Sequence, residues 1–246
     1  MTDPGLPRPG AAGASGSEWD RARIAGPDDL ARMFHVSRET LARLQTYAGL
    51  LVKWQKTINL VAPGTLPEMW QRHFADSAQL FELIPSGARH LMDIGSGGGF
   101  PGLVLAIMAA EKHHLDPAEP PLRITLVESD ARKCAFMREV ARQTGIAVDI
   151  MSTRIETIPN CDRVAPVDVI TSRALAALPL LFELVEPIFA AGCLALFLKG
   201  RTAEDEVSEA RKSWGFELEQ RPSQTMSDAR ILLIKDLKRS KGGLIP

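Results

Sequence analysis

The segment from Leu91 to Gly102, which reads LMDIGSGGGFPG, constrains the fold of this chain more than any other part of the sequence. Two apolar residues lead into Asp93, and glycines follow at the alternate positions 95, 97 and 99. This pattern predicts a strand that enters a turn without side chains, with a helix starting directly after it. Such a turn lets backbone N–H groups and a helix N-terminus approach a ligand closely, so we expect a nucleotide-like cofactor here.

Predicted strands and helices alternate through the remainder of the chain. Strands are predicted at 91–94, 122–128, 148–151, 167–171, 193–198, 216–220 and 230–236. Helices are predicted at 103–110, 131–143, 178–189 and 203–212. This alternation predicts an α/β fold with a seven-stranded, mostly parallel sheet that is covered by helices on both faces. A ligand should bind beyond the carboxyl ends of its strands.

Four regions are expected along the chain. Residues 1–27 are rich in Gly, Pro, Ala and Ser and are interpreted as a disordered tail. An N-terminal helical region covers residues 28–88, and the domain with the sheet covers residues 89–237. A basic C-terminal tail covers residues 238–246. The helical region should hold one helix over 37–58 with Ser37 as its cap, and a second that a capping box at 65–68 opens. Residues 111–121 should form a polar loop away from the ligand edge.

Composition excludes several classes of protein. The chain has 246 residues, of which 45% are apolar, so it can bury a full core. Its 29 Lys and Arg balance 30 Asp and Glu, which argues against binding nucleic acid through bulk positive charge. Three widely spaced cysteines indicate neither a disulfide framework nor a metal site. The sequence shows neither a signal peptide nor a stretch of membrane-spanning length, so we expect a cytoplasmic enzyme.

The glycine-rich turn is compatible with two cofactors. Residues 97–102 match G-x-G-x-x-G, a pattern typical of dinucleotide binding. Asp93 ahead of the glycines disfavours a diphosphate, whereas a ligand with an ammonium and a sulfonium tolerates it. Phe100 and Pro101 also enclose the turn, which favours S-adenosylmethionine. Glu128 can accept both ribose hydroxyls in either case. The competing interpretation is an ordinary glycine turn, with Asp93 capping the loop and Glu128 solvated.

Six segments in chain order carry a resemblance to a known family. They are Lys53-Trp54-x-Lys56-x-x-Asn59-Leu60, Arg72-His73-x-x-Asp76-Ser77, Met92 to Gly102, Arg154-Ile155-Glu156, Ser172-Arg173-Ala174 and Leu198-Lys199-Gly200. Over about residues 28–236 the chain resembles the RsmG family, also called glucose-inhibited division protein B, of 16S ribosomal RNA guanine-N7 methyltransferases. The resemblance implies a Rossmann-like class I fold, S-adenosylmethionine as methyl donor, and N7 of a guanine near the decoding centre as acceptor. The N-terminal tail, the 111–121 loop and Gly98 depart from the family pattern.

The expected chemistry needs no general base, because guanine N7 carries a lone pair and no proton. Positioning the two reactants can supply about 7–11 kcal/mol of the barrier. Glu128 is expected to hold the ribose, and Ile155 and Glu156 to contact the adenine, although these two residues can equally well form a helix start. The cofactor-binding residues expected from the sequence are Asp93, Gly95, Gly97, Phe100, Glu128, Ile155, Glu156 and Arg173.

The expected catalytic residues are Arg173, Lys199, Asn59 and His73. Arg173 ends a strand and is expected to pair with the cofactor carboxylate or to face the RNA, against the alternative of a structural salt bridge. Lys199 is expected at phosphate or guanine, against a solvated strand end. Asn59 can hydrogen-bond a guanine edge, and His73 is the weakest candidate, since a packed histidine is the commoner case.

The near-neutral charge predicts modest affinity for naked RNA, so we expect the substrate to be the small ribosomal subunit or its precursor. The protein is expected to act as a monomer, without a membrane. Three alternatives stay open. They are a small-molecule methyltransferase whose helical region forms a lid, a binding protein that keeps the fold without catalysis, and a nucleotide-dependent oxidoreductase.

Overall fold

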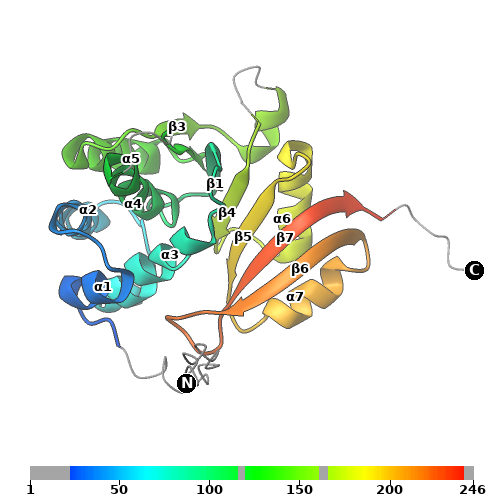
Figure 1. Cartoon of the computed structure of the whole chain (residues 1–246), viewed down its shortest axis with the longest axis horizontal. Coiled ribbons are helices and arrows are strands. Elements are labelled where there is room, and N and C mark those ends of the chain that lie inside the picture. Colours follow the sequence, from blue (N-terminus) through cyan, green and yellow to red (C-terminus); the bar gives the residue numbers. More distant parts are fainter. Residues whose placement is uncertain (1–22, 116–119, 161–165, 241–246) are drawn as a thin grey trace, which may run out of the picture.

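A seven-stranded sheet in the order β3-β2-β1-β4-β5-β7-β6 forms the centre of the molecule (Figure 1). The computed structural model describes residues 23–115, 120–160 and 166–240. The first five strands are parallel, whereas β7 is antiparallel to both β5 and β6. The strands are β1 (His90–Ile94), β2 (Arg123–Glu128), β3 (Asp149–Ser152), β4 (Val169–Arg173), β5 (Leu194–Lys199), β6 (Trp214–Pro222) and β7 (Arg230–Arg239). The predicted α/β fold with a mostly parallel sheet is therefore confirmed.

Helices cover both faces of the sheet (Figure 1). One face packs against α2 (Arg38–Gln55), α4 (Gly102–Leu115) and α5 (Ala131–Thr144), and the other against α6 (Leu178–Val185) and α7 (Ala203–Ala210). Side chains alternate between the two cores along β1, because successive residues of a strand point to opposite faces. Leu91 belongs to the first core, and Met92 and Ile94 belong to the second. None of the described helices combines the length and hydrophobicity that crossing a bilayer requires.

The helical region differs from the prediction in its second half. The first half agrees, since α1 (Pro27–Phe34) precedes α2 and the hydroxyl of Ser37 accepts the N–H of Thr40 as the expected cap. The predicted capping box at 65–68 is wrong, because the Thr65 hydroxyl donates to the carbonyl of Ala62 at 2.7 Å and caps no helix. Pro67 cannot donate a backbone hydrogen bond, and no single α-helix spans this stretch. Short turns replace it, namely η2 (Pro63–Glu68), η3 (Trp70–Ala75), α3 (Asp76–Ala78) and η4 (Phe81–Leu83).

Three predicted boundaries are also wrong. The end of the expected 1–27 tail packs onto the domain, since Ile24 is buried and its N–H donates to Gln71 Oε1 at 2.7 Å. The expected loop at 111–121 begins late, because α4 continues through Leu115 and Glu111 accepts the N–H of Ser37 at 3.0 Å. The expected tail at 238–246 overlaps β7. The remaining parts of these predictions, at 1–22, 116–119 and 241–246, lie outside the described residues.

Candidate functional site

A cavity of about 950 Å³ opens at the carboxyl edge of the parallel strands, where the sequence places the ligand. This volume lies within the range of sites that bind cofactors and small ligands. The ends of β1, β2, β4 and β5 form its floor, and the segment after β3, the helical region and the loop after β6 contribute to its walls. The lining residues used below are Gly95, Gly97, Gly98, Phe100, Glu128, Ile155, Glu156, Arg173, Lys199, Glu206, Arg72, His73, Asp76, Met226 and Ala229.

The glycine-rich turn follows β1 and is held by its own hydrogen bonds. Gly97 and Gly99 have φ angles of +57° and +93°. Residues other than glycine rarely adopt a backbone conformation in this left-handed region. The Gly97 N–H donates to Glu128 Oε2 at 2.9 Å, and the Gly99 and Phe100 N–H groups donate to the carbonyl of Ser96. These N–H groups are not free to cradle an anion. The turn therefore fits a ligand without a diphosphate better than a dinucleotide.

Asp93 lies beneath the turn and does not line the cavity. Its buried carboxylate accepts the hydroxyl of Thr171 at 2.8 Å and the N–H of Gly102, the first residue of α4, at 3.2 Å. Burial raises the pKa of Asp93 to about 6, against the opposing effect of these hydrogen bonds. The prediction that Asp93 faces the cofactor is thus corrected, because the structure gives its oxygens to the turn and to the start of α4.

Glu128 and Ile155 lie where the sequence places them, at one end of the cavity. Glu128 is half-buried, and its Oε1 atom accepts the N–H of Asp130 at 2.8 Å. Each carboxylate oxygen has a second lone pair, so Glu128 can still accept a ribose hydroxyl. Ile155 is buried, and the exposed Glu156 follows it at the start of a 3₁₀ turn. The expected helix start is confirmed and lines the cavity, so it does not compete with the expected contact to adenine, which stays a prediction.

Phe100 is surrounded by rings from the helical region. Tyr47 stacks on it with ring centroids 5.0 Å apart, and the rings of His73 and Phe100 are 5.2 Å apart. The hydroxyl of Tyr47 donates to the carbonyl of Gly98 at 2.5 Å, so α2 fastens the glycine-rich turn. Sequence reasoning missed Tyr47. A single tyrosine within the apolar stripe of a helix was the signal available.

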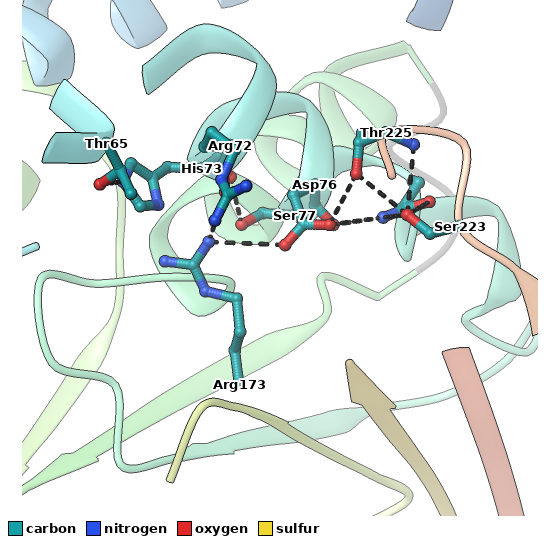
Figure 2. A network of polar contacts seen from close by, with 9 residues as sticks. Thr65, Arg72, His73, Asp76, Ser77, Arg173, Ser223 and Thr225 are labelled. Atoms are coloured by element: carbon teal, nitrogen blue, oxygen red, sulfur yellow. Dashed lines mark hydrogen bonds and ion pairs between the residues drawn. The ribbon is translucent and has the colours of Figure 1, made fainter. Parts of the chain in front are cut away.

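Arg173 extends from the end of β4 towards the helical region (Figure 2). Its Nη1 atom donates to the carbonyl of Arg72 at 2.9 Å and lies 3.5 Å from Oδ2 of Asp76 in α3. The guanidinium also lies over the ring of Phe100, 5.0 Å from the ring centroid. Arg173 therefore lines the cavity and also forms a salt bridge. A structural salt bridge and a position facing the ligand, which the sequence offered as alternatives, are compatible. Asp76 belongs to one of the segments that carry the family resemblance, but the sequence analysis gave it no role in the site.

Lys199 ends β5 and is held on the same edge of the sheet. Its side chain is only 9% exposed, its Nζ atom lies 2.8 Å from Oε2 of Glu206, and it donates to the carbonyl of Ala176. The interpretation of Lys199 as a solvated strand end is wrong. Burial raises the pKa of Glu206, but the hydrogen bonds from Lys199 and Thr202 and the charge of Lys199 outweigh burial and leave the pKa lowered.

His73 lines the cavity, whereas Asn59 does not. His73 is 7% exposed, and its Nε2 atom lies 2.7 Å from the hydroxyl of Thr65. Burial, followed by the charges of Arg173 and Arg72, lowers the pKa of His73 to about 3, so its ring is neutral at physiological pH. Asn59 is exposed beside the rim, 3.4 Å from Gln55. The structure thus brings Arg173, Lys199 and His73 together and leaves Asn59 outside.

The residues at the β1–β2 end of the cavity fit S-adenosylmethionine. Glu128 offers acceptor capacity for a ribose, and Ile155 offers a buried apolar surface for a purine. Most N–H groups of the glycine-rich turn donate to acceptors within the protein, so they are not available to a diphosphate.

Comparisons with known proteins identify the family. The sequence model of a family described as rRNA small subunit methyltransferase G matches residues 40–232. "Ribosomal RNA small subunit methyltransferase G" of Paramagnetospirillum magneticum is 49% identical over 218 residues, covering 88% of this chain and 98% of the relative. The protein of the same name from Parvibaculum lavamentivorans is 46% identical over 220 residues, covering 89% and 93%.

Solved structures of lower identity share the fold. An O-methyltransferase from Bacillus cereus in complex with SAH is 14% identical, with a TM-score of 0.51, and the match covers 82% of this chain and 92% of that chain. The fold is therefore the Rossmann-like class I fold of S-adenosylmethionine-dependent methyltransferases. Together with the sequence matches, these findings show that the chain belongs to the rRNA small subunit methyltransferase G family.

Proposed function

We propose that this protein methylates N7 of a guanine in 16S ribosomal RNA near the decoding centre, with S-adenosylmethionine as donor. The observation that carries the proposal is the division of the cavity into two unlike halves. Glu128, Ile155 and the glycine-rich turn line one half, and Arg173 and Lys199 lie at the ends of the next two strands. The first half suits a nucleoside, and the second half places cations where a nucleotide would enter.

In the cofactor half, S-adenosylmethionine supplies a methyl group activated on its sulfonium. Glu128 would accept hydrogen bonds from the ribose, and Ile155 would pack against the adenine. Phe100, fixed by its stack on Tyr47, closes the wall near the methionine end. These contacts hold the donor, and they add no proton transfer.

In the acceptor half, the protein positions the guanine base and removes no proton from it. Guanine N7 would attack the methyl carbon with its in-plane lone pair while the carbon–sulfur bond breaks and leaves a neutral thioether. No residue would have to remove a proton. His73 suits this reaction, because its pKa of about 3 makes it a poor base at neutral pH. Bringing the two reactants into line can account for about 7–11 kcal/mol of the barrier.

Arg173 and Lys199 have different positions relative to the two substrates. β4 is the neighbour of β1 in the sheet, and β5 lies one strand farther away. Arg173 therefore acts at the junction between the cofactor and the nucleotide, and Lys199 acts on the RNA alone. The target guanine must leave its stack to arrive there, at a cost of a few kcal/mol.

The proposed substrate is the small ribosomal subunit or its precursor, on which the protein acts as a monomer. The formal net charge of −1 supports this choice, because naked RNA is bound mainly through its phosphates. An assembled particle can also be recognised by its shape, which compensates for the weak electrostatic attraction.

The proposal is tested by incubating the protein with methyl-labelled S-adenosylmethionine and under-methylated small subunits, naked 16S rRNA or a pool of small metabolites. We expect label in 16S rRNA, at a guanine where borohydride and aniline cleave the chain, and more label from subunits than from naked RNA. Label confined to metabolites would contradict the proposal and favour a small-molecule methyltransferase. Preference for naked RNA would contradict only the assembled substrate.

A further inference from the structure

The Asp76 carboxylate contacts two separate parts of the cavity wall (Figure 2). Its Oδ2 atom lies 3.5 Å from Nη1 of Arg173, at the end of β4. Its Oδ1 atom accepts the hydroxyl of Thr225, in the loop after β6, at 2.8 Å and the side-chain amide of Gln79 at 2.9 Å. The side chain of Asp76 is only 12% exposed. A buried carboxylate of the helical region thus joins a strand end to a distant loop.

The loop at 223–229 is fastened to the helical region beside Asp76. The N–H of Gln224 donates to Oε1 of Gln79 at 2.8 Å, which fixes the direction of the Gln79 amide. Two residues of the same loop, Met226 and Ala229, line the cavity. The two Asp76 oxygens therefore have unlike surroundings, since Oδ1 faces donors that are themselves fixed and Oδ2 faces Arg173.

Arg173 has few other contacts that set its direction. The carbonyl of Arg72 accepts from its Nη1 atom, and the ring of Phe100 lies beneath it. A guanidinium is planar and presents its donors in a fixed fork, so an acceptor on one edge orients the others. We propose that Asp76 is a positioning residue that holds the Arg173 guanidinium over Phe100, at the junction of the two halves of the cavity. This inference rests on the proposed function, in which Arg173 acts at that junction.

The charge of Asp76 is costly to the fold, which argues for a role beyond packing. Burial raises the pKa of Asp76, while Arg173 and the hydroxyl of Thr225 lower it and do not fully offset burial. A neutral amide would satisfy Thr225 and Gln79 without this cost. The charges of Arg173 and Arg72 favour the carboxylate form, and Arg173 is the one that forms an ion pair with it.

Asp76→Asn separates these two roles. Because Gln79 is fixed by Gln224, the amide oxygen of the new side chain remains towards Gln79 and Thr225. The amide NH₂ group then faces the Arg173 guanidinium, donor against donor, and the pair is lost while the volume is kept. Asp149→Asn is the matched control, since Asp149 forms an exposed ion pair with Arg123 at 2.6 Å, away from the cavity.

Three quantities are measured for each variant. For Asp76→Asn, we expect kcat for methyl transfer to fall about 10- to 100-fold, with affinity for SAH and KM for the subunit within about threefold. The variant should stay folded at the assay temperature, although the unpaired Arg173 guanidinium lowers the thermal midpoint. The ¹⁵N-edited NMR signals of the Arg173 guanidinium should lose the slow rotation that a held side chain shows. Asp149→Asn should match the wild type in all three.

A second pair of variants tests the loop contact without touching Asp76. Thr225→Val removes the hydroxyl that donates to Oδ1, and Thr225→Ser restores it. We expect Thr225→Val to lower kcat about 3- to 10-fold and Thr225→Ser to recover it.

The outcomes separate the inference from the proposed function. A wild-type protein without transfer to RNA would contradict the proposed function, whereas the guanidinium signals test the positioning of Arg173 without any activity. Unchanged guanidinium signals in Asp76→Asn would overturn the inference, even if kcat falls, because Asp76 would then act on a substrate directly. A fall in thermal midpoint that accounts for the lost transfer would overturn it as well.

Discussion

Arg173 and Lys199 are buried cations at the ends of adjacent strands, but their carboxylate partners come from different parts of the molecule. Lys199 pairs with Glu206 of α7, the helix that directly follows its own strand. Arg173 pairs with Asp76 of the helical region, which precedes the whole sheet in the chain. One side of the site is thus built within a local strand–helix unit, and the other depends on the docking of a separate region.

The two pairs also differ in how well the charges are compensated. Nζ of Lys199 lies 2.8 Å from Glu206, and the pKa of Glu206 is lowered. Nη1 of Arg173 lies 3.5 Å from Asp76, and the pKa of Asp76 is raised by burial. Lys199 therefore more than offsets the burial of the Glu206 carboxylate, whereas Arg173 only partly offsets the burial of the Asp76 carboxylate. This difference agrees with our proposal that the Arg173 side serves the reaction.

The largest expected effect follows from Arg173→Ala. Methyl transfer should fall about 100-fold or more, because the cation at the junction of the two substrates is removed. The protein should remain folded, since Asp76 can take up a proton once the guanidinium is gone. Arg142→Ala, which removes an exposed cation of α5 paired with Glu139, serves as the control in the same transfer assay. Transfer at the wild-type rate by Arg173→Ala would remove Arg173 from the site.

Glu206→Gln should act mainly on stability. It removes the charge that Lys199 faces in a largely buried position, and we expect a loss of about 2 kcal/mol in the free energy of unfolding. Denaturant unfolding measures this loss. Glu209→Gln on the same helix breaks an exposed pair with Lys212 and should change the free energy by less than about 0.5 kcal/mol. Equal values for the two variants would contradict the contrast between the pairs.

Tyr47→Phe tests the helical region at a second point. The variant keeps the stack on Phe100 but leaves the carbonyl of Gly98 without the phenolic donor. We expect a loss of about 1–1.5 kcal/mol in the free energy of unfolding and a modest loss of affinity for SAH, by calorimetry. Unchanged stability and affinity would show that α2 does not support the glycine-rich turn.

The smallest effect is the opposite pH dependence of the two pairs. Glu206 has a lowered folded-state pKa, so its contribution is present above its unfolded pKa and is lost as pH falls through the folded value. Asp76 has a raised folded-state pKa, so its cost is present at neutral pH and disappears as pH falls through that value. Unfolding measured from pH 7 to 4 should show the stability of the wild type rising relative to that of Asp76→Asn as Asp76 takes up its proton. The disadvantage of Glu206→Gln should persist until the carboxylate of Glu206 protonates. Parallel trends would contradict this account.

Local patterns in the sequence predicted most of the fold. All seven strands were found, because most are short apolar runs and β3 and β6 fit the order of strands and helices along the chain. Ser37 was found because a cap depends on residues within one helical turn. The segment at 63–83 was misread, because the apolar spacing resembles a helix while Pro67 and tertiary packing break it.

The site was predicted in part for the same reason. Residues at strand ends, such as Glu128, Arg173 and Lys199, follow from the order of the strands. The partners that hold them depend on which distant segments pack together, so Asp76 and Tyr47 could not be derived from spacing. Asn59 was predicted as a catalytic residue because it lies in a segment that resembles the family. In the structure it is exposed and does not line the cavity.

The most direct test of the central claim is the content of 7-methylguanosine in 16S rRNA, measured by mass spectrometry of nucleosides. Under-methylated small subunits are incubated with S-adenosylmethionine and either the wild-type protein or Arg173→Ala. We expect about one modified nucleoside per 16S rRNA with the wild type and almost none with the variant. Its absence with the wild type, or an equal amount with both proteins, would contradict the account.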